Sequence, residues 1–327
     1  MQVAEHAAGS VEIRIWKSST DSFEDVLYLM NKSHNFEITQ DWLITKLGWG
    51  KGGLGALAYV NEQPVGLALL GSAPYRELGK PVDLMWSLDN FIVEEYRGRG
   101  IYHLLLKHLS QAADKDGIQL ILTFPNLQSR PGFERAGWST LHPMWAHVRP
   151  ALSGGIPRNI KRFSAFVKSR KSGFQVEKTL GLTEKDIDCI SNRVKIDESR
   201  LEFDPSYPAI EWRFHAKRAP GYRAVHLADC SGVFKVGLRG NLREAQLLAT
   251  FPRQLNPKQL RNLFSSIRST CDADLVTMLC NERFTLNKAF RTGIWPIRTV
   301  TTPLLRYGSG KHLRMKPTLS GIDLHLW

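Results

Sequence analysis

The stretch from Asp89 to Leu106, DNFIVEEYRGRGIYHLLL, decides the fold of the first half of this chain. A strand is predicted to lead into the loop EEYRGRG, which contains Gly98 and Gly100. A helix is predicted to follow, from Ile101 to about residue 116, because apolar residues recur there at the spacing of one buried face. The sequence therefore predicts a strand, a glycine-rich turn and a helix in direct succession.

A turn of this kind is suited to an anion. Its backbone amides converge at a helix N-terminus, where the partial positive charge favours a bound phosphate. Gly98 and Gly100 permit close approach, and Arg97 and Arg99 add positive charge. A dinucleotide fingerprint would need a third glycine where His103 stands, and a P-loop would need a following Gly-Lys-Ser/Thr. The turn therefore indicates a phosphate site of another type.

A second motif, NLQSRPGFERAGW at residues 126–138, follows at a defined distance. Together the two motifs resemble the GNAT superfamily of N-acetyltransferases. In that family a strand leads into Arg/Gln-x-x-Gly-x-Gly/Ala, a helix and a strand, and then into Asn-x-x-Ala/Ser-x-x-x-Tyr-x-x-x-Gly-Phe. The first motif falls on residues 97–102 and the second on Asn126, Ser129, Phe133, Gly137 and Trp138. The resemblance covers about residues 11–150.

The resemblance implies acetyl-CoA, or another acyl-CoA, as acyl donor and no metal. The pyrophosphate is expected on the backbone amides of residues 97–102, and the pantetheine arm beside the strand. Asn126 is expected to contact that arm or to brace the neighbouring helix. The residues implied in coenzyme A binding are Phe91, Ile92, Val93, Arg97, Gly98, Arg99, Gly100, Ile101, Tyr102, Asn126, Ser129 and Phe133.

Two positions depart from the family pattern. Tyr102 stands where the family has glycine or alanine, and Phe133 stands where many members have the tyrosine that protonates the leaving thiolate. A thiol of pKa about 8.5 is a fair leaving group without that tyrosine. The general base that must deprotonate an attacking amine is assigned first to Asp89. The other residues considered for this role are His34, Glu37 and His142.

The chain has 327 residues, enough for two domains. Its second half repeats the order of strands and helices of the first, which predicts an internal duplication. We expect an α/β (α+β) fold of two tandem GNAT-like domains, with mixed, mostly antiparallel sheets flanked by helices. The expected parts are a catalytic domain over 1–150, a basic linker with an amphipathic helix over 151–180, and a degenerate acceptor-recognition domain over 181–327.

The net charge differs between the two halves of the chain. Residues 1–150 hold 14 Lys and Arg against 16 Asp and Glu, whereas residues 151–327 hold 30 against 15. The segments DNFIVEEYRGRGIY, FPNLQSRPGF and EWRF are similar to tandem GNAT proteins of bacterial surface-polysaccharide clusters, which implies an amino sugar or nucleotide-linked amino sugar as acceptor. An anionic acceptor of this kind would suit the basic half. The segment EWRFHAKRAPGY either contacts such an acceptor or packs in an interface.

Other functions stay open from the sequence. The acyl donor could instead be an acidic acyl carrier protein or an aminoacyl compound, and the protein could be a non-catalytic sensor or an anion- or nucleic-acid-binding protein. The intact turn at residues 97–102 speaks against an aminoacyl donor, and nucleic acid is not the expected partner. The four cysteines form no CxxC pair, and no signal segment or membrane-spanning run is visible, so a cytoplasmic location is expected. The sequence does not predict an oligomeric state.

Overall fold

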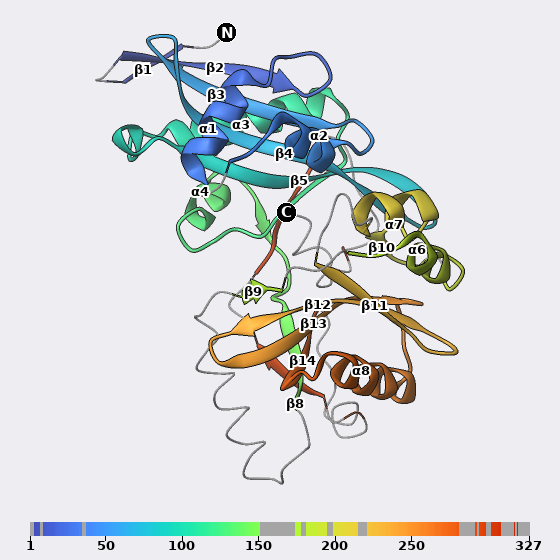
Figure 1. Cartoon of the computed structure of the whole chain (residues 1–327). Coiled ribbons are helices and arrows are strands. Elements are labelled where there is room, and N and C mark those ends of the chain that lie inside the picture. The colour runs from blue at the N-terminus through green and yellow to red at the C-terminus, as the bar shows by residue number, and fades with distance from the viewer. Residues whose placement is uncertain are drawn as a thin grey trace. The chain divides into compact units, whose positions relative to one another are not determined.

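The structure is a computed structural model in which the chain forms two compact units (Figure 1). Unit 1 comprises Met1–His142, Thr301–Lys316 and Trp327, and unit 2 comprises Pro143–Val300 and Pro317–Leu326. Of the linker predicted over 151–180, the part from 151 to 173 and residues 178–180 lie outside the described residues, and Phe174–Val176 form a strand. The structure describes residues 3–6, 9–34, 37–150, 174–177, 181–194, 199–214, 221–280, 292, 294–298, 302–308, 317 and 319.

Unit 1 contains one mixed sheet with strand order β1-β2-β3-β4-β5-β6-β16-β7. Among the neighbouring strands of this order, as far as the structure describes them, β5–β6 is the one parallel pair. Its elements are β1 (Val3–His6), β2 (Gly9–Lys17), α1 (Glu24–Ser33), α2 (Gln40–Leu47), β3 (Gly53–Val60), β4 (Gln63–Glu77), β5 (Lys80–Ile92), the 3-10 helix η1 (Glu94–Tyr96), α3 (Ile101–Lys115), β6 (Leu120–Thr123), α4 (Arg130–Arg135), β7 (Ser139–Thr140) and β16 (Leu304–Tyr307).

Helices cover both faces of this sheet, because successive strand residues point to opposite sides. On β3, Ala56 and Ala58 pack in the core beneath α3 and α4, together with Leu105 of α3. Leu57 and Tyr59 pack in a second core with α1 and α2. Every residue of β3 is therefore buried, as expected for a strand with helices on both sides.

The parallel pair β5–β6 is short. Its register covers only residues 84–86 of β5, opposite residues 120–122 of β6. At that point Trp86 stacks on Phe124, with ring centroids 5.1 Å apart, and Pro125 follows, which has no backbone amide to extend a ladder. Beyond Trp86, β5 keeps β4 as its neighbour on one side but has no recorded strand partner on the other within the described residues.

Unit 2 repeats this topology, with three antiparallel strands, a helix and a parallel strand. The strand order is β11-β12-β13-β14-β8-β15, with β9 also paired to β12, and only β13–β14 is parallel. Its elements are β8 (Trp145–Pro150), β9 (Phe174–Val176), α6 (Glu184–Ser191), β10 (Leu201–Phe203), α7 (Tyr207–Phe214), β11 (Tyr222–His226), β12 (Ser231–Arg239), β13 (Leu242–Phe251), α8 (Pro257–Cys271), β14 (Leu275–Cys280) and β15 (Trp295–Arg298).

The expected fold class of mixed sheets flanked by helices is therefore confirmed, although the strands do not follow one another in simple tandem order. β8 comes directly after unit 1 in the chain but lies between β14 and β15 of the second sheet. β16 comes after unit 2 but lies between β6 and β7 of the first sheet. The stretch IRTVTTPLLRY at residues 297–307 contains the end of β15 and all of β16, which belong to different sheets. Each sheet thus needs a strand from a distant part of the sequence.

β16 is firmly anchored in unit 1. Leu304 is completely buried in the core beneath α3, and Arg306 forms two hydrogen bonds of 3.0 and 2.7 Å to the carboxylate of Asp114 on α3.

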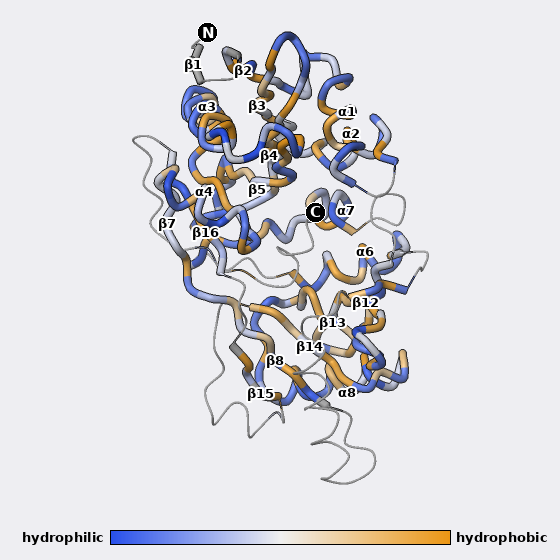
Figure 2. Tube along the Cα trace, turned by 90° about the vertical axis from the view of Figure 1, so that its left-hand side faces the viewer, coloured by the Kyte–Doolittle hydropathy of each residue, from blue (hydrophilic) through white to orange (hydrophobic). Residues whose placement is uncertain are grey.

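Figure 2 shows the apolar residues gathered along the inner strands and along the inward faces of the helices in each unit.

We predict that Leu304→Ala lowers the free energy of unfolding by about 2–5 kcal/mol, because the substitution removes a buried side chain from the core of unit 1. Urea unfolding of the whole chain measures this effect. Leu127, whose side chain is 83% exposed, provides the control, and Leu127→Ala should change stability by no more than about 0.5 kcal/mol. Equal effects of the two substitutions would contradict the place given to β16.

Candidate functional site

A pocket of about 840 Å³ opens in unit 1 where β5 and β6 separate. It joins the end of β5, the glycine-rich loop, the start of α3 and the start of α4, which brings both sequence motifs to one place. Its lining residues are Asn90, Phe91, Ile92, Tyr96, Arg97, Gly98, Gly100, Ile101, Tyr102, His103, Asn126, Gln128, Ser129, Gly132 and Arg135.

The glycine-rich loop has the conformation that its sequence predicts. Gly98 and Gly100 both have φ of +77°, which residues with a side chain rarely adopt. Gly100 is the N-cap of α3, and no side chain caps the helix there. In the described part of the chain, no acceptor is recorded for the amides of residues 98–102. The start of α3 therefore presents free donors to the pocket.

The pocket wall is basic. Arg97, His103 and Arg135 line it, and none of the lining residues is acidic. The Nε of Arg97 donates to the carbonyl oxygen of Ile92 at 3.0 Å, which holds this guanidinium over the end of β5. Together with the helix N-terminus, these side chains make the pocket suitable for a ligand that carries phosphate groups. Arg135 could not be predicted as a pocket residue from the sequence, because the position of α4 in the fold brings it there.

Asn126 organises the start of α4. Its Oδ1 accepts hydrogen bonds from the amides of Gln128 and Ser129, at 3.0 and 2.8 Å. Its carbonyl oxygen accepts one from the amide of Arg130. Of the two roles expected for Asn126, the structure shows the bracing of the neighbouring helix, and its position in the lining leaves the other role open.

Three of the predicted binding residues do not line the pocket. Val93 follows the end of β5 and packs against the core beneath α1 and α2, while its amide donates to the carbonyl oxygen of Val65. The guanidinium of Arg99 lies over the ring of Tyr96, 5.2 Å from its centroid. Phe133 is 1% exposed in the core beneath α3 and α4, so its position in the motif serves packing.

Tyr102 fills space that a small residue of α4 leaves open. A Cβ at Gly132 would lie only 2.4 Å from Cε1 of Tyr102, so glycine and tyrosine fit as a pair. The ring of Tyr102 also packs edge-on against Phe133, with centroids 5.8 Å apart. Burial raises the pKa of Tyr102, and its buried hydroxyl has no hydrogen-bond partner among the described residues. Tyr102 thus places a buried tyrosine hydroxyl at the wall of the pocket, whereas Phe133, at the motif position where many family members have tyrosine, has no hydroxyl.

Asp89 lies at an irregularity of β5, where two residues face a single residue of β4. Its carboxylate accepts a hydrogen bond of 2.8 Å from Nζ of Lys46 on α2, and Nε2 of His34, at the end of α1, lies 3.4 Å from its other oxygen. Two of the four residues considered for a general base are therefore neighbours. No contact of Glu37 or His142 with Asp89 is recorded among the described residues.

Unit 2 has a different helix start at the corresponding place. Asn256 caps α8, and its side chain accepts from the amide of Gln259 while the Gln259 side chain accepts from the amide of Asn256, both at 2.9 Å. Pro257, the first residue of α8, has no amide hydrogen. The side chains of Asn256 and Gln259 thus satisfy amides at the start of α8, whereas the start of α3 is left open to a ligand.

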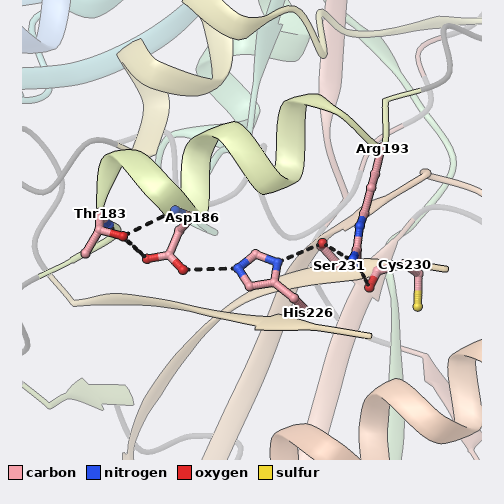
Figure 3. Close-up of polar contacts among 6 residues, drawn as sticks. All are labelled: Thr183, Asp186, Arg193, His226, Cys230 and Ser231. Atoms are coloured by element: carbon pink, nitrogen blue, oxygen red, sulfur yellow. Dashed lines mark hydrogen bonds and ion pairs between the residues drawn. The ribbon is translucent and has the colours of Figure 1, made fainter. Parts of the chain in front are cut away.

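A second polar cluster, not predicted from the sequence, lies in unit 2 (Figure 3). Nε2 of His226 lies 3.0 Å from Oδ1 of Asp186, and Nδ1 of His226 lies 2.9 Å from Oγ of Ser231. The order Asp-His-Ser is that of a hydrolytic triad. However, Ser231 is completely buried and Arg193 also donates to its hydroxyl, at 3.0 Å. The cluster joins α6 to β11 and β12 and does not present a nucleophile.

The residues of EWRFHAKRAPGY that the structure describes are mostly buried. Trp212, Arg213 and Phe214 at the end of α7 are 8%, 7% and 0% exposed. The Arg213 guanidinium lies over the rings of Phe214 and Tyr222, at 6.0 and 5.6 Å. Of the two roles expected for this segment, its described part supports packing. Residues 215–220 lie outside the described residues.

The fold and the pocket together define a class of protein, an α/β chain whose first unit has an uncapped helix N-terminus beside an open strand edge. Residues 21–138 match the model of the acetyltransferase (GNAT) family. The chain therefore carries a GNAT domain over residues 21–138, which lie within unit 1.

Solved structures share this fold over almost the whole chain. A GCN5-related N-acetyltransferase from Kribbella flavida is 13% identical, with a TM-score of 0.56 over 91% of this chain and 71% of its own. One from Anabaena variabilis is 12% identical, with a TM-score of 0.59 over 91% and 73%. N-myristoyltransferase from Saccharomyces cerevisiae is 14% identical, with a TM-score of 0.53 over 93% and 81%. No protein with a curated description matches the sequence.

None of the helices in the described part of the chain is long and apolar enough to span a membrane. The four cysteines all lie in the described part of the chain and form no disulfide with one another.

We predict that Asp186→Asn destabilises the protein at neutral pH by about 1–2 kcal/mol, because a charged acceptor of Thr183 and His226 is lost. Burial by itself would raise the pKa of Asp186, but the hydrogen bonds from Thr183 and His226 outweigh it and lower that pKa.

The carboxylate therefore stabilises the fold above the pKa of the unfolded state, near pH 4, and this stabilisation is lost as pH falls through the lower folded pKa. Urea unfolding from pH 7 to pH 3 should show the difference between wild type and variant shrinking with acidity. A difference that is constant over this range would contradict the role of the charge.

Proposed function

We propose that this protein is an acyl-CoA-dependent N-acyltransferase, acetyl-CoA being the first donor to test, that transfers the acyl group to a primary amine. The observation that carries this proposal is the pocket in which the free amides of α3 lie beside the open edge of β5. The match of residues 21–138 to the GNAT family supports the reaction type.

The residues present fit coenzyme A. The amides of residues 98–102, with Arg97 and Arg135, would hold its pyrophosphate, because a helix N-terminus and guanidinium groups both favour phosphate. The open edge of β5, from about Ser87 to Ile92, would take the pantetheine arm. When bound, the thioester supplies an activated acyl group. We propose no binding role for the side chains of Val93 and Phe133, which face the core.

We propose that Asp89 and His34 together remove the proton from the attacking amine. An amine of pKa about 10.4 is a poor nucleophile until it is deprotonated. The carboxylate of Asp89 orients the imidazole of His34, and Lys46 keeps the carboxylate in place from the other side. The irregularity of β5 turns Asp89 toward α1 and α2, directly before the strand edge assigned to the acyl donor.

For the acceptor, we propose an amino sugar, free or linked to a nucleotide. Trp42 on α2 is 39% exposed, and Nζ of Lys46 lies 4.6 Å from its ring centroid. An exposed indole beside Asp89 offers a flat apolar face to a sugar ring, and Lys46 joins the two residues. The basic composition of residues 151–327 supports an anionic acceptor or an acidic carrier protein. A cytoplasmic location stays a prediction.

We predict that acetyl-CoA at 100 times its dissociation constant stabilises the protein by about 2.7 kcal/mol. Thermal unfolding with and without the ligand measures this stabilisation. The double substitution Arg97→Glu, Gly100→Asp should abolish it, because two carboxylates then face the phosphates.

Acyl-CoAs of longer chains belong in the same experiment, since one structural neighbour was solved with bound myristoyl-CoA. Release of free coenzyme A in the presence of amines, amino sugars first, tests turnover. Absence of stabilisation by every acyl-CoA would overturn the proposal, and an acyl carrier protein would become the donor to test.

We predict that Asp89→Asn and His34→Gln each lower kcat by about 100-fold or more, the usual contribution of general acid–base catalysis. Asp83→Asn, which removes an exposed carboxylate from the same strand, serves as the control and should retain activity. An unchanged kcat in both site variants would exclude this pair as the base.

A further inference from the structure

The surface of α8 in unit 2 has an unusual charge. The helix contains three basic residues, Lys258, Arg261 and Arg268, and no acidic residue. Its opposite face is apolar and packs on the sheet of unit 2. Arg261 and Arg268 are seven residues apart, which places them on one side of the helix about 10 Å from each other along its axis.

A third arginine reaches this helix from the sheet. Arg149 on β8 donates through Nη1 to the carbonyl oxygen of Arg261 at 2.6 Å and to Oγ of Ser265 at 2.8 Å. Ser265 lies between Arg261 and Arg268 on the same side of the helix. Both bonds use Nη1, and no partner is recorded among the described residues for the other guanidinium nitrogens of Arg149.

These three arginines have no acidic partner among the described residues. Other arginines of unit 2 do pair with carboxylates, such as Arg239 with Glu244 and Arg243 with Glu177. Burial, together with the nearby charges of Arg261 and Arg268, lowers the pKa of Arg149. Like charges held together repel each other, and an anion bound among them would relieve that repulsion.

We propose that Arg149, Arg261 and Arg268 form an anion-binding site on unit 2 that takes a phosphate group. Guanidinium groups bind phosphate oxygens in pairs of parallel hydrogen bonds. Ser265 has a positioning role, because its hydroxyl donates to the carbonyl oxygen of Arg261 at 3.0 Å and accepts from Arg149. The site is separate from the pocket of unit 1 and does not depend on acyl transfer. The phosphate belongs either to a small phosphorylated compound or to the backbone of a polynucleotide.

The test titrates the whole chain with sodium phosphate by isothermal calorimetry, against sodium chloride at equal ionic strength. Arg261→Gln and Arg268→Gln, which change only the helix surface, should each weaken phosphate binding about five-fold or more, because each removes a charge-assisted contact. Arg149→Gln should do the same, with its fold checked by circular dichroism. Lys185→Gln on α6 removes one exposed positive charge elsewhere in unit 2 and is the matched control.

A second arm titrates a short single-stranded oligonucleotide at several salt concentrations. Tighter binding than free phosphate, with a salt dependence that becomes shallower in the arginine variants but not in Lys185→Gln, assigns the site to a polynucleotide backbone. Binding of phosphate without the oligonucleotide assigns it to a small compound. The proposal is overturned if neither probe binds, or if the arginine variants bind as the Lys185→Gln control does.

Discussion

The separation of β5 from β6 after Trp86 is the constraint on which the candidate site depends. Only three residue pairs hold these parallel strands together, and the stacking of Trp86 on Phe124, followed by Pro125, ends their ladder. A longer β6 would satisfy the remaining edge of β5 and close the space beside α3. Because the strands part there, an open strand edge and a helix N-terminus face the same pocket. The chemistry that we propose follows from this early end of one strand.

The part of the site that the sequence predicted is the part that local geometry determines. Gly98 and Gly100 have positive φ because the turn requires it, and the apolar spacing from Ile101 defines α3. The motif alone could not show which side chains face inward. Phe133 faces the core, and Arg135 reaches the pocket only through the packing of α4 on α3.

Long-range pairing accounts for what the sequence could not show. β8 and β16 have six and four residues, and nothing in their composition distinguishes the sheet that each joins. The contacts of Asp89 could not be predicted for the same reason. His34, at the end of α1, and Lys46 on α2 lie more than 40 positions earlier in the chain. A hydrophobic pattern predicts that a strand exists, but the neighbour of that strand depends on the completed core.

The two units show how one topology can diverge in its use of a helix. α3 and α8 both have 15 residues and both precede the parallel strand of their sheet. α3 begins at Gly100 with free amides, so its N-terminus is open to a ligand, whereas Asn256 and Gln259 close the start of α8. The exposed side of α8 instead carries arginines without acidic partners among the described residues. Anion binding by the backbone at the end of one helix and by side chains along the other would use the same scaffold in two independent ways. Arg261 and Arg268, two of the basic residues of the second half, would then have a specific role on the fold.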